Sequence, residues 1–153
     1  MNVLIWITEG TWRACVDAAR TLAPADAGLV LLHVTDADVP AAAHGAFTGL
    51  LGRGHPERDP GDRLDDLAAT SAGELLDAAA AHLGRPATRV ERRGRIEHEV
   101  VEQAGTAGLL VLARDGGHHR PGPKSLGPAT RFVVDHAPCP VLLVWPDEPP
   151  ARG

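Results

Sequence analysis

The stretch from Arg114 to Leu126 combines glycines with basic residues, which is the composition of an anion-binding loop. Gly116 and Gly117 would let the backbone approach a ligand closely. The donors that follow them are His118, His119, Arg120 and Lys124. A helix expected to begin at Pro128 would turn its unpaired N–H groups and partial positive charge toward the same place, and Thr130 adds a hydroxyl. On composition alone, a solvated surface loop without a ligand is the better-supported interpretation.

A second turn that could contact a ligand, Glu9-Gly10-Thr11, follows the first apolar run of the chain. In open parallel sheets, ligands bind beyond the carboxyl ends of the strands, where the strand order reverses. If the first strand is central, with the second strand on one side and the fourth on the other, this turn and the loop from Arg114 to Gly117 border one crevice. No nucleophile with a positioned base is legible in the sequence, so we infer no enzymatic activity.

Continuous apolar runs predict the strands that would hold these turns. A run without alternation indicates a strand covered by helices on both faces, as in a parallel sheet. Such runs are Val3 to Thr8, Leu29 to Val34, Leu109 to Ala113 and Pro140 to Trp145. A weaker, charged strand from Ala87 to Arg93 is typical of a sheet edge, where charges discourage unwanted pairing.

Apolar residues at helical spacing predict four helices between these strands. Their expected starts are near Trp12, Asp62, Ile96 and Pro128. We expect Asp62 to cap the second helix. The apolar stripe of that helix would consist of Leu64, Leu67, Ala68, Ser71, Leu75, Ala78 and Ala79. Strands that alternate with helices predict an α/β fold: an open, parallel, five-stranded sheet with helices on both faces, which is a Rossmann-like architecture.

Length and composition are those of one ordinary globular domain. The chain has 153 residues, 44% hydrophobic and 23% charged, which excludes wholesale disorder. A net charge of −5, with both signs interspersed, predicts no nucleic-acid partner. No apolar run approaches about 18 residues, so we expect no membrane association. Cys15 and Cys139 lack metal-site spacing and the start lacks the basic segment of a secretion signal, so we expect a cytoplasmic protein with reduced thiols.

The expected domain covers residues 1–146. Residues 147–153 would form a frayed tail. A long irregular stretch over 35–61 is expected to be a flap, because loops of this length in a compact domain are usually functional or mobile.

Five short segments have a characteristic order and spacing along the chain. They are the turn Glu9-Gly10-Thr11, the turn 94–97, the strand 109–113, Leu126-Gly127 followed by Thr130, and the run His136-Ala137-Pro138-Cys139-Pro140-Val141-Leu142-Leu143-Val144. Together they resemble the universal stress protein family over nearly the whole chain, and the last run is close to what that family carries after its last helix. The resemblance implies a strand order of 3-2-1-4-5, a homodimer and, in many members, ATP bound in the crevice.

The chain departs from the family's nucleotide motif, Gly-x2-Gly-x9-Gly-Ser/Thr, so the resemblance implies a degenerate ATP site. Ala113 replaces the first Gly, and if Gly116 is the second, ten residues instead of nine precede Gly127. Pro128 replaces the hydroxyl residue, which removes one N–H donor as well. The Cβ at position 113 would crowd a phosphate, and Glu9 is one methylene longer than the family's Asp. We therefore expect ATP to bind weakly or not at all, and Mg²⁺ only beside a bound nucleotide.

On this resemblance, the residues placed at the nucleotide site are Glu9, Gly10, Thr11, Val34, Ala113, Gly116, Gly117, Gly127, Ala129 and Thr130. Adenine would lodge against Val34 and the apolar strand ends, because a purine needs only a slot and one or two backbone partners. Two functions follow. The favoured one is a non-catalytic, dimeric stress-response and interaction module with weakened or lost ATP binding. The alternative is a stress regulator that binds ATP or another adenine nucleotide in the crevice.

The last strand, Val141 to Trp145, is expected to lie at the sheet edge and to pair with its copy in a homodimer. A tail folded back over this strand is the alternative. Adjacent histidines at 118 and 119 rarely both ligate one ion, so no metal site is expected. Cys139 is interpreted as a packing residue, although a redox sensor is the other reading.

Overall fold

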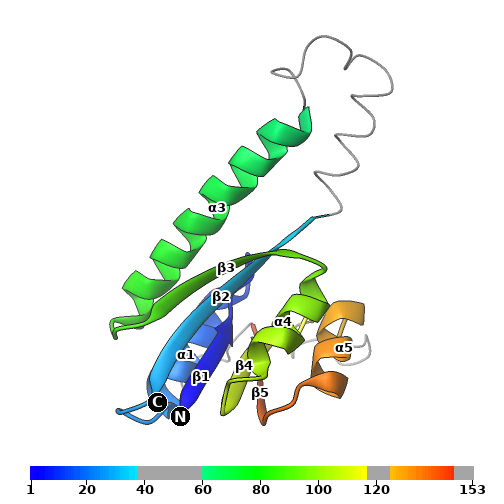
Figure 1. Cartoon of the computed structure of the whole chain (residues 1–153). Helices are drawn as coiled ribbons and strands as arrows, with labels where there is room; N and C mark the ends of the chain where they lie inside the picture. Colours follow the sequence, from blue (N-terminus) through cyan, green and yellow to red (C-terminus); the bar gives the residue numbers. More distant parts are fainter. Residues whose placement is uncertain (38–59, 117–124, 147–153) are drawn as a thin grey trace.

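The first apolar run of the sequence forms the central strand of a parallel sheet. The computed structural model describes residues 1–37, 60–116 and 125–146. The strands are β1 (Asn2–Trp6), β2 (Gly28–Asp36), β3 (Thr88–Gly94), β4 (Leu109–Ala113) and β5 (Val141–Val144). All neighbouring strands pair in parallel, in the order β3-β2-β1-β4-β5 (Figure 1). The predicted sheet and its strand order are confirmed.

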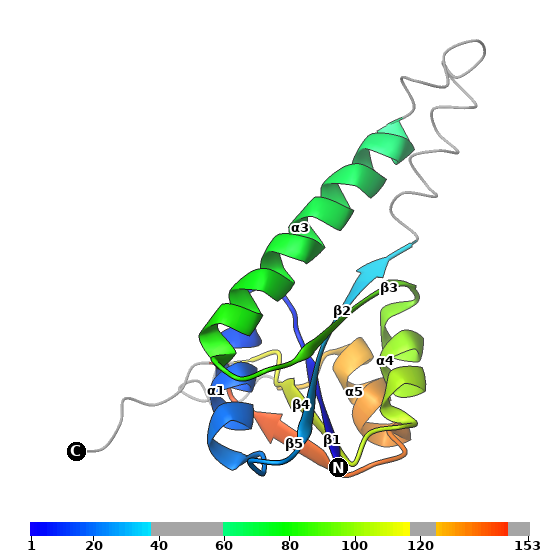
Figure 2. The same ribbon diagram turned by 60° about the vertical axis from the view of Figure 1, so that its left-hand side comes forward.

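Helices cover both faces of this sheet, as the unbroken apolar strands require. They are α1 (Trp12–Leu22), α3 (Pro60–Leu83), α4 (Ile96–Ala104) and α5 (Pro128–His136). Figures 1 and 2 show α1 and α3 on one face and α4 with α5 on the other. Along β1, Val3 and Ile5 pack into the core beneath α1 and α3, whereas Leu4 and Trp6 pack beneath α4 and α5. Side chains alternate along a strand, so both faces of a doubly covered strand must be apolar.

The helix α3 begins earlier than the sequence indicates and buries only part of the predicted stripe, including Leu75 and Ala79. It starts at Pro60, so Asp62 lies inside the first turn and the expected cap at that residue is wrong. Among the α3 side chains that the structure describes, the buried ones are Ala72, Leu75, Leu76, Ala79 and Leu83. Of the predicted stripe, Leu67, Ser71 and Ala78 are exposed. The N-terminal half of α3 extends beyond the sheet (Figures 1 and 2), so Leu67 and Ser71 have no strand to pack against, whereas Ala78, in the C-terminal half, is exposed beside the buried Ala79.

Two further segments refine the predicted boundaries. β2 continues to Asp36, because its last residues pair with β3 as far as Gly94. The predicted flap over 35–61 therefore begins inside a strand and ends inside a helix, and its remainder, 38–59, lies outside the described residues, as does the tail 147–153. β3 lies at one edge of the sheet, as its charges indicated, and β5 lies at the other.

Both cysteines are free, and neither has the environment of a reactive thiol. Cys15 lies on the buried face of α1 and is fully buried, and this burial raises the pKa of its thiol to about 12. Cys139 is half-buried against the core beneath α4 and α5, and burial raises its pKa as well. None of the described helices combines the length and the hydrophobicity needed to cross a bilayer.

Candidate functional site

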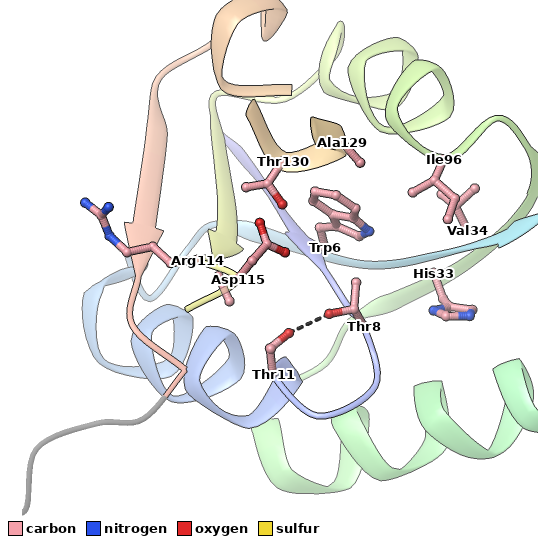
Figure 3. A pocket seen from close by; sticks show the side chains of 11 residues that line it. Trp6, Thr8, Thr11, His33, Val34, Ile96, Arg114, Asp115, Ala129 and Thr130 are labelled. Atoms are coloured by element: carbon pink, nitrogen blue, oxygen red, sulfur yellow. Dashed lines mark hydrogen bonds between the residues drawn. The ribbon is translucent and has the colours of Figure 1, made fainter. Parts of the chain in front are cut away.

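A cavity of about 280 Å³ lies beyond the carboxyl ends of β1 and β4, where the sheet order reverses (Figure 3). Its walls come from the ends of three strands and from the first residues of α4 and α5. The lining residues are Trp6, Thr8, Thr11, His33, Val34, Ile96, Ala113, Arg114, Asp115, Ala129 and Thr130. The turns after β1 and β4 therefore border one cavity, at the place where open parallel sheets usually bind their ligands.

The start of α5 forms one wall of this cavity. Pro128 is the first helical residue, as predicted, and the first helical hydrogen bond runs from Arg131 N to Gly127 O. The N–H groups of Ala129 and Thr130 precede that bond, so they belong to the set that has no partner within the helix. Thr130 is only 5% exposed and also presents its hydroxyl at the cavity.

The carboxylate of Asp115 lies directly over the start of α5. Its Oδ2 accepts a hydrogen bond from Gly127 N at 2.5 Å, and its own N–H donates to Ser125 O at 2.7 Å. A Cβ added to Gly127 would lie 3.2 Å from Oδ2, so the glycine makes room for the carboxylate. A negative charge at this place is favoured by the helix dipole.

Arg114 does not direct its charge into the cavity, although its backbone lines it. Its Nη1 donates to Ser125 Oγ at 2.7 Å, and its guanidinium lies 4.5 Å from the centre of the Trp145 ring. Figure 3 shows the side chain pointing away from the other lining residues. Stacking on an indole and a hydroxyl contact hold the cation on the far side of the strand end.

Two lining residues, Trp6 and Arg114, have a buried side-chain nitrogen without a hydrogen-bond partner, and that of Trp6 faces the wall opposite α5. Trp6 is 6% exposed, and its Nε1 is buried without a hydrogen-bond partner. Figure 3 shows the nitrogen on the edge of the indole that faces Val34 and His33. A buried indole N–H normally finds an acceptor, so this donor indicates a place for a ligand atom.

His33 places a hydrogen-bond acceptor in the same wall. Its Nδ1 lies 2.8 Å from the carbonyl oxygen of Ile7, which can only accept. The neutral ring therefore carries its proton on Nδ1 and keeps Nε2 as an acceptor. The wall thus presents an indole donor from β1 and an imidazole acceptor from β2.

The turn after β1 closes the mouth of the cavity. Thr8 and Thr11 share a hydroxyl–hydroxyl hydrogen bond of 2.5 Å, and both line the cavity (Figure 3). Gly10 has a φ of 82°, which only glycine adopts readily, so the turn needs this residue for its backbone shape. Glu9 and Gly10 are exposed and do not line the cavity.

The structure brings five of the residues predicted for the site to the cavity wall: Thr11, Val34, Ala113, Ala129 and Thr130. Gly127 does not line the cavity, but its N–H donates to the lining residue Asp115. Gly116 is the residue after Asp115 and does not line the cavity either. Gly117, with the neighbouring basic residues 118–124, lies outside the described residues.

Sequence reasoning missed Trp6 and His33 as wall residues. Both were included only as members of the apolar runs Val3 to Thr8 and Leu29 to Val34. A usable signal was present in both, because each has a polar nitrogen near the carboxyl end of its predicted apolar run, and that end lies at the ligand edge of a parallel sheet.

Comparisons with known proteins agree with this architecture. The sequence profile of the universal stress protein family matches residues 2–144. The hypothetical protein MJ0577 has a similar structure at 15% identity, with a TM-score of 0.72 over 97% of both chains. Universal stress protein UspA from Lactobacillus plantarum is 23% identical with a TM-score of 0.61, covering 94% of this chain and 97% of its own.

A further solved structure is that of a universal stress protein in complex with cAMP. It is 18% identical to this chain, with a TM-score of 0.59, and the alignment covers 96% of this chain and 98% of the other. At these identities the likeness establishes the fold. Among curated proteins, none has a sequence significantly similar to this chain.

Proposed function

The chain belongs to the universal stress protein family, and from that premise we propose that it is a non-catalytic, dimeric, cytoplasmic module of the stress response with weakened or lost ATP binding. Partners would be engaged through the surface of the dimer rather than through turnover of a nucleotide. The two free cysteines are compatible with a reducing compartment.

The observation that carries the weakened ATP binding is that Ala113 lines the cavity and that Pro128 begins the helix whose next two residues line it. Pro128 opens α5 and has no N–H to offer, which removes a donor from the helix start that would face a phosphate. Ala113 ends β4 at the cavity wall and adds a Cβ where a glycine would allow close approach. Both substitutions work against a triphosphate and leave room for a smaller group.

The alternative is a regulator that binds ATP or another adenine nucleotide, with Mg²⁺ beside it. It is favoured by the cavity itself, because Val34 and the end of β1 provide the apolar slot that a purine requires. The relative with bound cAMP supports the same possibility by analogy. A volume of about 280 Å³ lies at the lower limit of ligand pockets, roughly 300 Å³, which fits a nucleoside better than a triphosphate.

Thermal unfolding with and without millimolar Mg-ATP tests the proposal. A ligand at ~100 times its dissociation constant adds about 2.7 kcal/mol to the free energy of unfolding. We expect no shift, and no adenine nucleotide released when purified protein is denatured. A clear shift, or a stoichiometric nucleotide in the supernatant, would favour the regulator.

A gain-of-function variant tests the physical reason. Replacing Ala113→Gly and Pro128→Ser restores one N–H, one hydroxyl and the space for a phosphate. We expect ATP affinity to rise about tenfold, since a hydrogen bond to a charged group contributes ~1.5–3 kcal/mol. Unchanged affinity in a folded double variant would show that these two residues do not limit ATP binding.

Dimerisation through β5 is supported by its place at the sheet edge. All four residues of β5 are only partly buried, and a groove of about 600 Å³ runs along Leu143, Val144 and Trp145 beside α1. The carbonyls of Pro140 and Val144 bond to β4. In a parallel pair, alternate residues bond to the same neighbour, so the N–H of Leu143 faces outward.

Two substitutions of Leu143 distinguish backbone pairing along the β5 edge from side-chain packing. Leu143→Pro removes the outward N–H, and Leu143→Ala keeps it while also losing side-chain contacts. We expect the wild type and Leu143→Ala to be dimers and Leu143→Pro to be a monomer with an unchanged circular dichroism spectrum. Light scattering measures the mass, and a dimeric Leu143→Pro variant would contradict pairing along this edge.

The absence of catalysis is proposed from the bonding of the wall residues. Among the described contacts, the Thr8 and Thr11 hydroxyls bond to each other, and His33 Nδ1 is held by a backbone carbonyl. A hydroxyl nucleophile needs a base within hydrogen-bond reach, and these contacts direct the hydroxyls elsewhere. We expect no release of phosphate from Mg-ATP above background, and turnover that is lost in Thr11→Val would overturn this.

A further inference from the structure

We propose that Asp115 acts as an internal anion at the start of α5, so that the cavity selects an uncharged nucleoside or nucleobase over its phosphorylated forms. This deepens the proposed function, on which it rests: weak ATP binding becomes a preference that one carboxylate imposes.

The first step is that an internal carboxylate already takes one of the donors at the start of α5, and the N–H groups of Ala129 and Thr130 are those left for a ligand. A helix N-terminus attracts a phosphate because its N–H groups and dipole point toward it. Here Asp115 Oδ2 takes the N–H of Gly127 at 2.5 Å, and Pro128 supplies no N–H. A phosphate oxygen that approached this position would meet a negative carboxylate in place of a donor.

The second step is that this carboxylate is held in place by the backbone. Asp115 N donates to Ser125 O at 2.7 Å, which ties the two ends of the loop together. Gly127 has no Cβ, and a Cβ there would lie 3.2 Å from the carboxylate oxygen. A phosphate would therefore have to break the hydrogen bond to Gly127 and displace a carboxylate whose backbone is fixed.

The third step is that the nearest described cation is directed away. The guanidinium of Arg114 lies over Trp145 and bonds to Ser125 Oγ. Its charge is therefore committed on the far side of the strand end, as Figure 3 shows. Within the described part of the wall, Asp115 sets the sign of the charge next to the helix start.

The fourth step is that the opposite wall suits a neutral heterocycle. Trp6 Nε1, in a residue 6% exposed, is a buried donor without a partner, and His33 keeps Nε2 as an acceptor. A planar base presents an acceptor and an amino donor side by side on one edge, as adenine does with N7 and its amino group. Both side chains line the same cavity of about 280 Å³, which is of nucleoside size.

Calorimetric titration with adenosine and with ATP tests the inference, because the two ligands share a base and ribose and differ in the phosphates. The proteins are the wild type, Asp115→Ala, which empties the position, and Asp115→Asn, which keeps an acceptor for Gly127 but removes the charge. Asp135→Asn, at the other end of α5, is the matched control. Thermal melting confirms that each variant is folded.

In the wild type we expect adenosine to bind at least about tenfold more tightly than ATP. Asp115→Ala should improve ATP affinity by about tenfold to a hundredfold, the range of a charge-assisted hydrogen bond, and leave adenosine affinity within about twofold. Asp115→Asn should show part of this gain, and Asp135→Asn should show none.

An ATP-to-adenosine affinity ratio that stays the same in both Asp115 variants would overturn the role of Asp115, and so would a failure of adenosine to bind any of the proteins. Tight ATP binding by the wild type would contradict the proposed function instead. The two failures are therefore read from different quantities, the ratio between variants and the affinity of the wild type.

Discussion

Replacing Trp6→Phe tests whether the cavity wall holds an unpaired donor at a cost in stability. The indole is 6% exposed, and its Nε1 has no partner in the folded chain. A phenyl ring fills most of the same space and removes that donor. The smaller ring therefore lowers the free energy of unfolding, whereas the removal of the unpaired N–H raises it.

The magnitudes nearly cancel. Phenylalanine buries ~60 Å² less apolar surface than tryptophan, which costs about 1.5 kcal/mol at ~25 cal/mol per Å². Leaving a buried donor unsatisfied costs about 1–3 kcal/mol, and this penalty disappears in the variant. We expect the free energy of unfolding of Trp6→Phe to lie within about 1.5 kcal/mol of the wild type. Trp6→Ala should lose about 3–5 kcal/mol.

Urea unfolding followed by circular dichroism measures both variants, with equal m-values as the test that only stability has changed. The same Trp6→Phe protein should bind adenosine about tenfold more weakly, because the ligand loses one hydrogen bond to a buried donor. A loss of more than about 2 kcal/mol in Trp6→Phe would refute the reasoning, since it would mean that the N–H is paired in the folded state.

Three further outcomes follow from burial and charge. Leu83→Ala should cost about 2–5 kcal/mol in urea unfolding, because Leu83 is fully buried, whereas Leu67→Ala, at a position 63% exposed, should stay within about 0.5 kcal/mol. Cys15, with a pKa of about 12, should resist a disulfide reagent at pH 8 in the folded protein and react once urea unfolds it. The pKa of Glu97 is lowered by its own backbone N–H and a neighbouring arginine, so Glu97→Gln should lose less than about 1 kcal/mol at pH 7, and unfolding curves should converge as the pH falls through the lowered pKa.

Sequence patterns predicted the sheet because a strand buried on both faces is an unbroken run of apolar residues. The run at β4 was placed at its observed bounds, Leu109–Ala113, since an unbroken apolar pentamer admits few alternatives. Pro128 marked the start of α5 for the same kind of local reason, a residue tolerated only in the first turn. The strand order came from the family resemblance rather than from the pattern.

The stripe of α3 was mispredicted because periodicity shows which residues share a helix face and not where that helix leaves the sheet. Leu67 has the right spacing but lies on the half of α3 that extends past the strands, so it stays exposed. Helical amphipathicity is a statement about a face, and burial also requires a partner at each turn.

The chemistry of the cavity could be located from the sequence but not assigned. The rule that ligands bind where strand order reverses placed Thr11 beside the loop that begins at Arg114, and both residues line the cavity. The contact between Asp115 and Gly127 spans twelve residues and depends on the path of the intervening loop, which no local pattern encodes. From the sequence, Asp115 could be a solvated loop residue or a group that repels phosphate, and only the observed hydrogen bond to Gly127 distinguishes these two roles.

Ligand selection at this cavity therefore depends on two N–H donors, one without an acceptor in the folded chain and one that already has an acceptor. Trp6 carries a donor that has no acceptor in the folded chain, so a ligand atom gains a hydrogen bond there without displacing one. Gly127 carries a donor that is already satisfied by Asp115, so a ligand gains nothing there unless it first breaks that bond. A ligand that bonds to the first group and avoids the second is favoured over one that needs both, and an uncharged base or nucleoside meets that condition, whereas a nucleotide with its phosphates at the start of α5 does not.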